Sequence, residues 1–135
     1  MTGVLLDSDV IIEVLRGRSP EILRKWINVV DNDEPLFYSP VSLAEIRPGM
    51  RDRERERIER MFSGMSCVPI EQEIGRRSGD YLRSFHASHA LALGDALIAA
   101  TASVHQLHLW TQNRKHFPMK DLQFFVQAGK RTKVQ

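Results

Sequence analysis

Three acidic residues, Asp7, Glu45 and Asp95, stand at places where a helix is predicted to begin. Asp7 ends the apolar run 4–6, Glu45 follows a second short apolar run, and Asp95 opens an apolar helix. Loops after different strands of a parallel α/β sheet converge on one crevice, so we expect these carboxylates to meet there. Three ionised carboxylates about 5 Å apart repel by roughly 3 kcal/mol per pair at an effective dielectric constant near 20. The group therefore needs a cation or a shared proton, and all-oxygen ligands suit Mg²⁺ or Mn²⁺.

Each acid also has a purely structural explanation. Asp7 or Ser8 can cap the helix that follows the first strand. Asp95 in a first helical turn gains about 0.3–1 kcal/mol from the helix dipole. The coincidence of the three acids favours a functional site over three separate caps.

The segment around Glu45 has a third structural explanation, a capping box. In that motif Ser42 caps the helix and Glu45 accepts a hydrogen bond from the Ser42 amide. Pro48 and Gly49 follow too closely for a long regular helix, because proline removes a backbone donor. The alternative is that Glu45 points across the end of the sheet toward Asp7.

The elements that must position these acids are predicted from periodicity and from start and stop signals. Strands are expected at 4–6, 36–39, 66–70, 107–111 and 122–126, and helices at 10–15, 20–30, from 42, 51–65, 71–85 and 94–102. Helices that alternate with short apolar strands indicate an α/β fold with a parallel sheet covered on both faces. Residues 1–128 are expected to form a single domain, and 129–135 a flexible basic tail.

Composition supports a globular protein of this kind. The chain has 135 residues, of which 42% are hydrophobic and 27% charged, so one domain with a sizeable core is expected. No apolar stretch reaches membrane-spanning length and the start does not resemble a signal peptide, so we expect a cytoplasmic protein. The single cysteine, Cys67, excludes an internal disulfide and is expected to be buried.

The net charge of +2 permits a nucleic-acid partner without demonstrating one. Arg16, Arg18, Arg114 and Lys115 flank the expected site and could form a rim for a phosphate-bearing substrate, although solvated surface charge is the commoner explanation. The run of charges from 51 to 60 is interpreted as a solvated helix face, supported by the pairs Arg51–Glu54 and Glu56–Arg60.

Four segments of the chain together resemble the PIN-domain family, specifically its VapC type of toxin ribonuclease. The segments are 5–11 (LLDSDVI), 42–49 (SLAEIRPG), 95–102 (DALIAATA) and 111–117 (TQNRKHF). This resemblance implies a PIN-like three-layer fold with a mostly parallel five-stranded sheet. It also implies an endoribonuclease dependent on Mg²⁺ or Mn²⁺ that leaves a 5′-phosphate, a small VapB-like antitoxin partner and a homodimer. Asp7, Glu45 and Asp95 fall on the family's acidic positions.

His116 departs from the resemblance, because the family commonly carries a fourth acid at this place. A histidine adds no negative charge for a hard cation, so we expect one metal held firmly by Asp7 and Asp95, with Glu45 direct or through water. A second metal is expected to bind more weakly or to arrive with the substrate phosphate. Asp9 or Asn113 is expected to supply the missing oxygen. Hydrogen bonds that support the metal ligands are expected from Ser42, Thr111 and Asn113.

Two other functions remain open at this point. The opening residues also resemble haloacid-dehalogenase-type phosphatases, with Asp7 as nucleophile and Asp9 as acid/base, although Ala99 stands where a later acidic pair is needed. The chain could instead bind RNA or a protein without cutting. A zinc site is disfavoured, because the pairs His86–His89 and His105–His108 lack further ligands.

Overall fold

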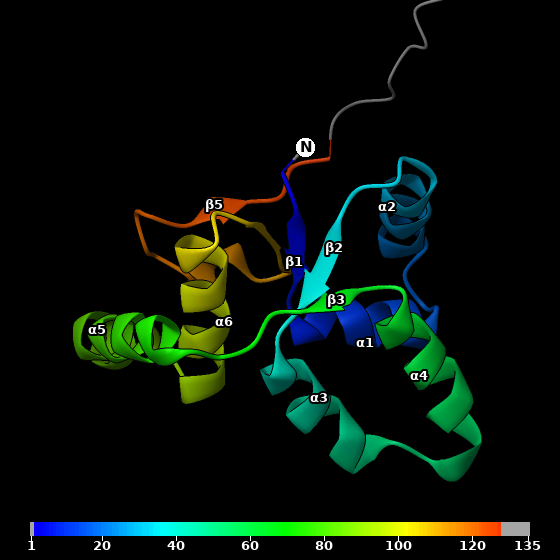
Figure 1. The fold of residues 1–135 in the computed structure, drawn as a ribbon, viewed down its shortest axis with the longest axis horizontal. Coiled ribbons are helices and arrows are strands. Elements are labelled where there is room, and N and C mark those ends of the chain that lie inside the picture. The colour runs from blue at the N-terminus through cyan, green and yellow to red at the C-terminus, as the bar shows by residue number, and fades with distance from the viewer. Residues whose placement is uncertain (1, 128–135) are drawn as a thin grey trace, which may run out of the picture.

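The computed structural model describes residues 2–127, so the basic tail expected at 129–135 lies outside the described residues. Its centre is a parallel sheet of five strands in the order β3-β2-β1-β4-β5 (Figure 1). The strands are β1 (Val4–Leu6), β2 (Leu36–Tyr38), β3 (Ser66–Cys67), β4 (His108–Trp110) and β5 (Gln123–Phe124). The predicted α/β fold with a five-stranded sheet is confirmed.

The helices lie where the sequence predicts them, with shifted ends. They are α1 (Ser8–Arg16), α2 (Pro20–Asp31), α3 (Pro40–Ile46), α4 (Arg55–Ser63), α5 (Gln72–His89) and α6 (Leu93–Val104), with short 3₁₀ turns η1 (Arg47–Gly49), η2 (Asp52–Glu54) and η3 (Arg114–His116). Within residues 2–127, none of these helices combines the length and the apolar character needed to cross a membrane.

Two hydrophobic cores cover the two faces of the sheet. Helices α5 and α6 lie on one face, and α1, α2 and α4 lie on the other (Figure 1). Successive residues of a strand point to opposite faces, so Leu5 packs with α6 while Val4 and Leu6 pack with α1. All three side chains are at most 1% exposed. The strand β1 is therefore the rigid centre that fixes the position of whatever follows it.

Local signals explain where the helices near the site start and stop. Gly17 ends α1 in the left-handed conformation at φ 66°, which glycine adopts without strain. The hydroxyl of Ser19 accepts a hydrogen bond from the amide of Ile22 at 3.2 Å, and Pro20 is the first residue of α2. Both signals were predicted from the sequence.

The capping box predicted at Ser42 is wrong. The cap of α3 is Ser39, whose hydroxyl accepts a hydrogen bond from the amide of Val41 at 3.1 Å, and Pro40 is the first helical residue. Ser42 lies inside the first turn and is fully buried. The helix begins two residues before the predicted start at 42, because the fixed φ of Pro40 suits the first helical position. The predicted end near Pro48 is confirmed, because α3 gives way to η1.

Two surface predictions are also corrected. Cys67 is exposed, because it lies on the two-residue edge strand β3. Glu54 does not pair with the Arg51 guanidinium; it accepts a hydrogen bond from the Arg51 backbone amide at 2.9 Å. The predicted pair of Glu56 with Arg60 is present, with nitrogen and oxygen 3.0 Å apart.

Candidate active site

Asp7 lies at the carboxyl end of the central strand β1 and is only 8% exposed. Its Oδ1 accepts a hydrogen bond from the amide of Ser8 at 2.8 Å, which caps α1. Its Oδ2 accepts a hydrogen bond from the hydroxyl of Thr111 at 2.9 Å. The predicted helix cap is confirmed, and Asp7 also lies at the carboxyl end of the central strand, as predicted.

The environment of Asp7 opposes its ionisation. The pKa of Asp7 is raised from 3.8 to about 7, mainly by burial, then by the charge of Asp9 and, least, by that of Asp95. The hydrogen bonds from Thr111 and Ser8 lower the pKa but do not cancel these effects. The site thus lacks the positive charge that would let its carboxylates ionise together.

Asp9, in the first turn of α1, faces the same crevice. Its Oδ2 accepts a hydrogen bond from the backbone amide of Gln112 at 3.2 Å. Its Oδ1 is buried and, among the described residues, has no hydrogen-bond partner. Burial is the main cause that raises the pKa of Asp9 above 3.8. A buried carboxylate oxygen without a donor is costly, and a bound cation is one way to satisfy it.

Glu45 is fixed by two serines. Its Oε1 accepts a hydrogen bond from the hydroxyl of Ser8 at 2.7 Å, and the Ser8 and Ser42 hydroxyl oxygens are 2.8 Å apart. Because Ser8 gives its one hydroxyl hydrogen to Glu45, Ser42 must donate to Ser8. This relay (Ser42, Ser8 and Glu45) joins α3 to α1 and turns Glu45 toward the end of the sheet.

Gly94 allows Glu45 to lie close to the start of α6. A Cβ at Gly94 would lie 3.4 Å from Oε2 of Glu45, at the close edge of ordinary van der Waals contact. Glu45 therefore lies beside the α6 terminus that carries Asp95.

Asp95 contacts His116 across the crevice. Its Oδ2 accepts hydrogen bonds from the amide of Ala92 at 3.2 Å and from Nε2 of His116 at 2.9 Å. An ionised carboxylate can only accept, so Nε2 carries the hydrogen in this pair. Both donors reach Oδ2, and no hydrogen bond within residues 2–127 reaches Oδ1.

The basic residues singled out in the sequence line two different grooves. Arg16 and Arg18 line a groove of about 590 Å³ together with Glu45. Arg114 and Lys115 line a second groove of about 770 Å³, on the side of β4. Arg114 is held in place there, because its guanidinium donates to the Phe125 carbonyl at 2.9 Å. The expected phosphate rim is thus two separate surfaces.

Asn113 contributes to the site through its backbone. Its amide donates to the hydroxyl oxygen of Thr111 at 3.1 Å, which orients the hydroxyl hydrogen toward Asp7. Ser42 and Thr111 are buried and make the hydrogen bonds expected of supporting residues. Sequence reasoning missed the roles of Ser8, Gln112 and Gly94. Their only signal was that each lies next to a residue already singled out.

The acids fit a divalent cation that keeps part of its water shell. No three His, Cys, Asp or Glu side chains in residues 2–127 stand close enough together to enclose a metal ion. Mg²⁺ does not require such a cage, because it retains several waters and binds one or two carboxylates plus substrate phosphate. The raised pKa of Asp7 and the unpartnered oxygen of Asp9 are what such an ion would relieve.

Comparison with known proteins gives a consistent family. The PIN domain model matches residues 4–121. The chain is 44% identical over 117 residues to Ribonuclease VapC10 of Mycobacterium tuberculosis, covering 86% of each chain. It is 33% identical over 121 residues to Ribonuclease VapC19 of the same species, covering 88% of this chain and 96% of the relative.

A solved structure agrees with these relatives. The toxin-antitoxin complex from Klebsiella pneumoniae contains a chain that superposes with a TM-score of 0.68 at 28% identity, covering 89% of this chain and 95% of that one. The parallel sheet, the acids at its carboxyl edge and the family match over residues 4–121 lead to one assignment. This chain belongs to the PIN-domain family and is similar to its VapC-type members.

Proposed function

We propose that this chain is a metal-dependent endoribonuclease, the toxin of a VapBC-type pair, which hydrolyses phosphodiester bonds of RNA. The observation that carries the proposal is the burial of Asp7 and Asp9 beside Asp95, with a carboxylate oxygen left unpartnered. The similarity to Ribonuclease VapC10 and Ribonuclease VapC19 supports the reaction class.

In this proposal Asp7 and Asp95 hold the ion directly, and Asp9 and Glu45 reach it through the waters that it keeps. A bound Mg²⁺ or Mn²⁺ would supply positive charge for the phosphate and make water more acidic. The chain's own residues orient the ligands: Thr111 holds Asp7, and His116 holds Asp95. His116 takes the place of a fourth acid by fixing Asp95 instead of adding charge.

Glu45 is the proposed general base. Its Oε1 is engaged by Ser8, whereas Oε2 faces the start of α6 and has no hydrogen-bond donor within residues 2–127. A carboxylate with one oxygen fixed and the other free is suited to accept a proton from attacking water. In-line attack would leave a 5′-phosphate and a 3′-hydroxyl.

The proposed partners are an RNA substrate and a small VapB-like antitoxin, with the toxin acting as a homodimer in the cytoplasm. The Klebsiella pneumoniae structure, titled a toxin-antitoxin complex, supports an antitoxin partner at 28% identity.

The direct test is cleavage of a pool of structured RNAs with Mg²⁺, with Mn²⁺ and with EDTA. We expect cleavage with either ion and none with EDTA. Asp95→Asn should lower the rate by at least about 100-fold, because it removes a ligand charge while keeping the side-chain shape. Asp80→Asn, on the exposed face of α5, is the matched control and should retain the wild-type rate.

Two results would contradict the proposal. Undiminished, Mg²⁺-dependent cleavage by Asp95→Asn would remove Asp95 from the site. Metal-independent RNA binding without any product would instead identify a binding protein.

A further inference from the structure

A groove lined by both polar and apolar side chains lies beside the acids and is not used by the proposed chemistry. It has a volume of about 770 Å³, within the range of about 300–1,000 Å³ typical of ligand pockets. The first turns of α2, residues 110–115 after β4 and residues 125–127 after β5 form its walls. We call it the β4 groove.

One wall of the β4 groove is also the wall of the acidic crevice. Thr111 donates to the Asp7 carboxylate at 2.9 Å, and Gln112 donates from its amide to the Asp9 carboxylate at 3.2 Å. The side chain of Gln112 donates in addition to the Asp9 carbonyl oxygen at 3.1 Å. A polymer whose phosphate lies at the acids can therefore continue into the groove along these residues.

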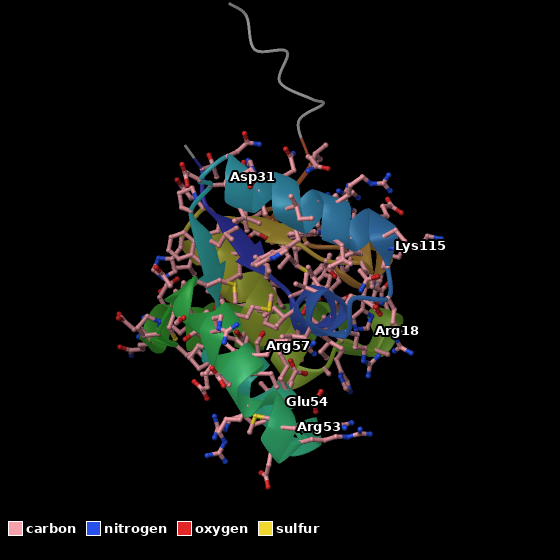
Figure 2. All side chains as sticks on the ribbon, turned by 90° about the vertical axis from the view of Figure 1, so that its right-hand side faces the viewer. Arg18, Asp31, Arg53, Glu54, Arg57 and Lys115 are labelled. Carbon is pink, nitrogen blue, oxygen red and sulfur yellow. The ribbon has the colours of Figure 1, made fainter. Side chains whose placement is uncertain are left out.

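The charges that line the β4 groove favour an anion, and one of them is free to move. Lys25 pairs with Glu21 at 3.3 Å, and Arg114 is fixed by the Phe125 carbonyl and lies 5.3 Å from the centre of the Phe124 ring. Lys115 is exposed and has no ion-pair partner in the described part of the chain. In Figure 2, Lys115 and Asp31 are labelled near opposite ends of α2.

The groove also carries an uncommitted amide. The backbone of Asn113 is bonded to Thr111, but its side chain makes no hydrogen bond within residues 2–127 and is exposed. A side-chain amide can both donate to and accept from a base edge, whereas an ammonium group is suited to phosphate. Asn113 thus offers a group suited to a base, and Lys115 offers one suited to a phosphate.

We propose that the β4 groove binds the RNA nucleotide next to the bond that is cut, with Lys115 on a backbone phosphate and Asn113 on a base edge. This inference rests on the proposed ribonuclease function and adds to it a surface that selects the cleavage site. Lys115 contributes affinity for any sequence, and Asn113 contributes preference among bases.

The first experiment measures binding of the structured RNA pool in EDTA at several salt concentrations, for the wild type, Lys115→Ala and Lys120→Ala. Lys120 is an exposed lysine five residues away that does not line the groove, so it is the matched control. We expect Lys115→Ala to weaken binding about 5–10-fold and to reduce the slope of log K against log salt by roughly one. Lys120→Ala should change affinity less than two-fold.

The second experiment compares the distribution of cleavage sites produced by the wild type and Asn113→Ala in Mg²⁺. Loss of a base contact changes the ratio between sites, whereas a purely structural defect lowers all sites together. We expect a change in that ratio of about 5-fold or more, corresponding to about 1 kcal/mol.

The outcomes separate this inference from the function on which it rests. If the wild type cleaves RNA while Lys115→Ala binds like Lys120→Ala, or Asn113→Ala keeps the wild-type site ratio, the β4 groove proposal is wrong and the function stands. If the wild type neither binds nor cleaves, the proposed function itself is wrong.

Discussion

The two sides of the acidic crevice are built differently. On the strand side, Asp7 and Asp9 are held by residues that follow β4, and Asp7 is buried. On the helix side, Glu45 is exposed and is held only through the serine relay. The helix that carries Glu45 is seven residues long and ends in the 3₁₀ turn η1.

The grooves next to the two sides are lined by different elements. The β4 groove is lined by the loop that holds the acids, by α2 and by the segment after β5. The groove beside Glu45 is lined by residues of α1, α3 and α4, among them Ile12, Ile46 and Ile58. We conclude that the strand side holds Asp7 and Asp9 firmly in position, whereas the helix side holds Glu45 less firmly.

The largest effect on stability is expected on the strand side, when the buried charge of Asp7 is removed. An acid whose pKa is raised by folding stabilises the protein below its unfolded pKa of 3.8, and this contribution is lost as the pH rises through about 7. At pH 8 without metal, Asp7→Asn should therefore raise the free energy of unfolding by roughly 2–4 kcal/mol. Thermal unfolding in EDTA at pH 4 and pH 8 measures this difference.

The same thermal unfolding experiment can be repeated with Mg²⁺. The ion should raise the melting temperature of the wild type at pH 8 and leave Asp7→Asn nearly unchanged, because a ligand stabilises only the state that binds it. Asp80→Asn is the control for an exposed acid. If Asp7→Asn is no more stable than the wild type at pH 8, then ionising Asp7 in the folded protein costs no free energy of unfolding.

Thr111→Val tests how firmly the strand side must hold Asp7. Valine keeps the shape of threonine but removes the hydroxyl that donates to Asp7 at 2.9 Å. Loss of a residue that orients a metal ligand typically costs about 10–100-fold in activity or metal affinity, and we expect a loss of this size. The hydrogen bond lowers the pKa of Asp7, so its removal should also shift the acidic limb of the pH–rate profile to higher pH. A loss of rate without that shift would show that Thr111 does not control the pKa of Asp7.

The strand side is also the part that the sequence predicts well. An apolar run that ends in Asp7 indicates a central strand with an acid at its carboxyl end, and the helix signals at Gly17 and Ser19 are local. Such features depend on neighbours in the chain, so their physical cause can be recognised from a few residues.

The cap of α3 was predicted wrongly because the contacts of Ser42 join distant residues. Ser42 resembles a cap when only residues 42–45 are considered, but its hydroxyl meets Ser8, 34 positions away. The pairing of His116 with Asp95, 21 positions apart, is likewise invisible to local patterns. The exposure of Cys67 depends on β3 being an edge strand, which follows from the order of the strands and not from the residues around Cys67.

The smallest effect should come from the serine relay. Ser42→Ala removes the donor to Ser8 but leaves the hydrogen bond from Ser8 to Glu45, so we expect RNA cleavage to fall only about 2–5-fold and stability by about 1 kcal/mol. Ser63→Ala is the matched control, because that exposed serine bonds only to the carbonyl of its own helix. Cleavage rates and thermal unfolding of both variants provide the measurement. A loss as large as that of Thr111→Val would mean that Glu45 is held as strictly as Asp7, and the distinction between a fixed strand side and an adaptable helix side would then be wrong.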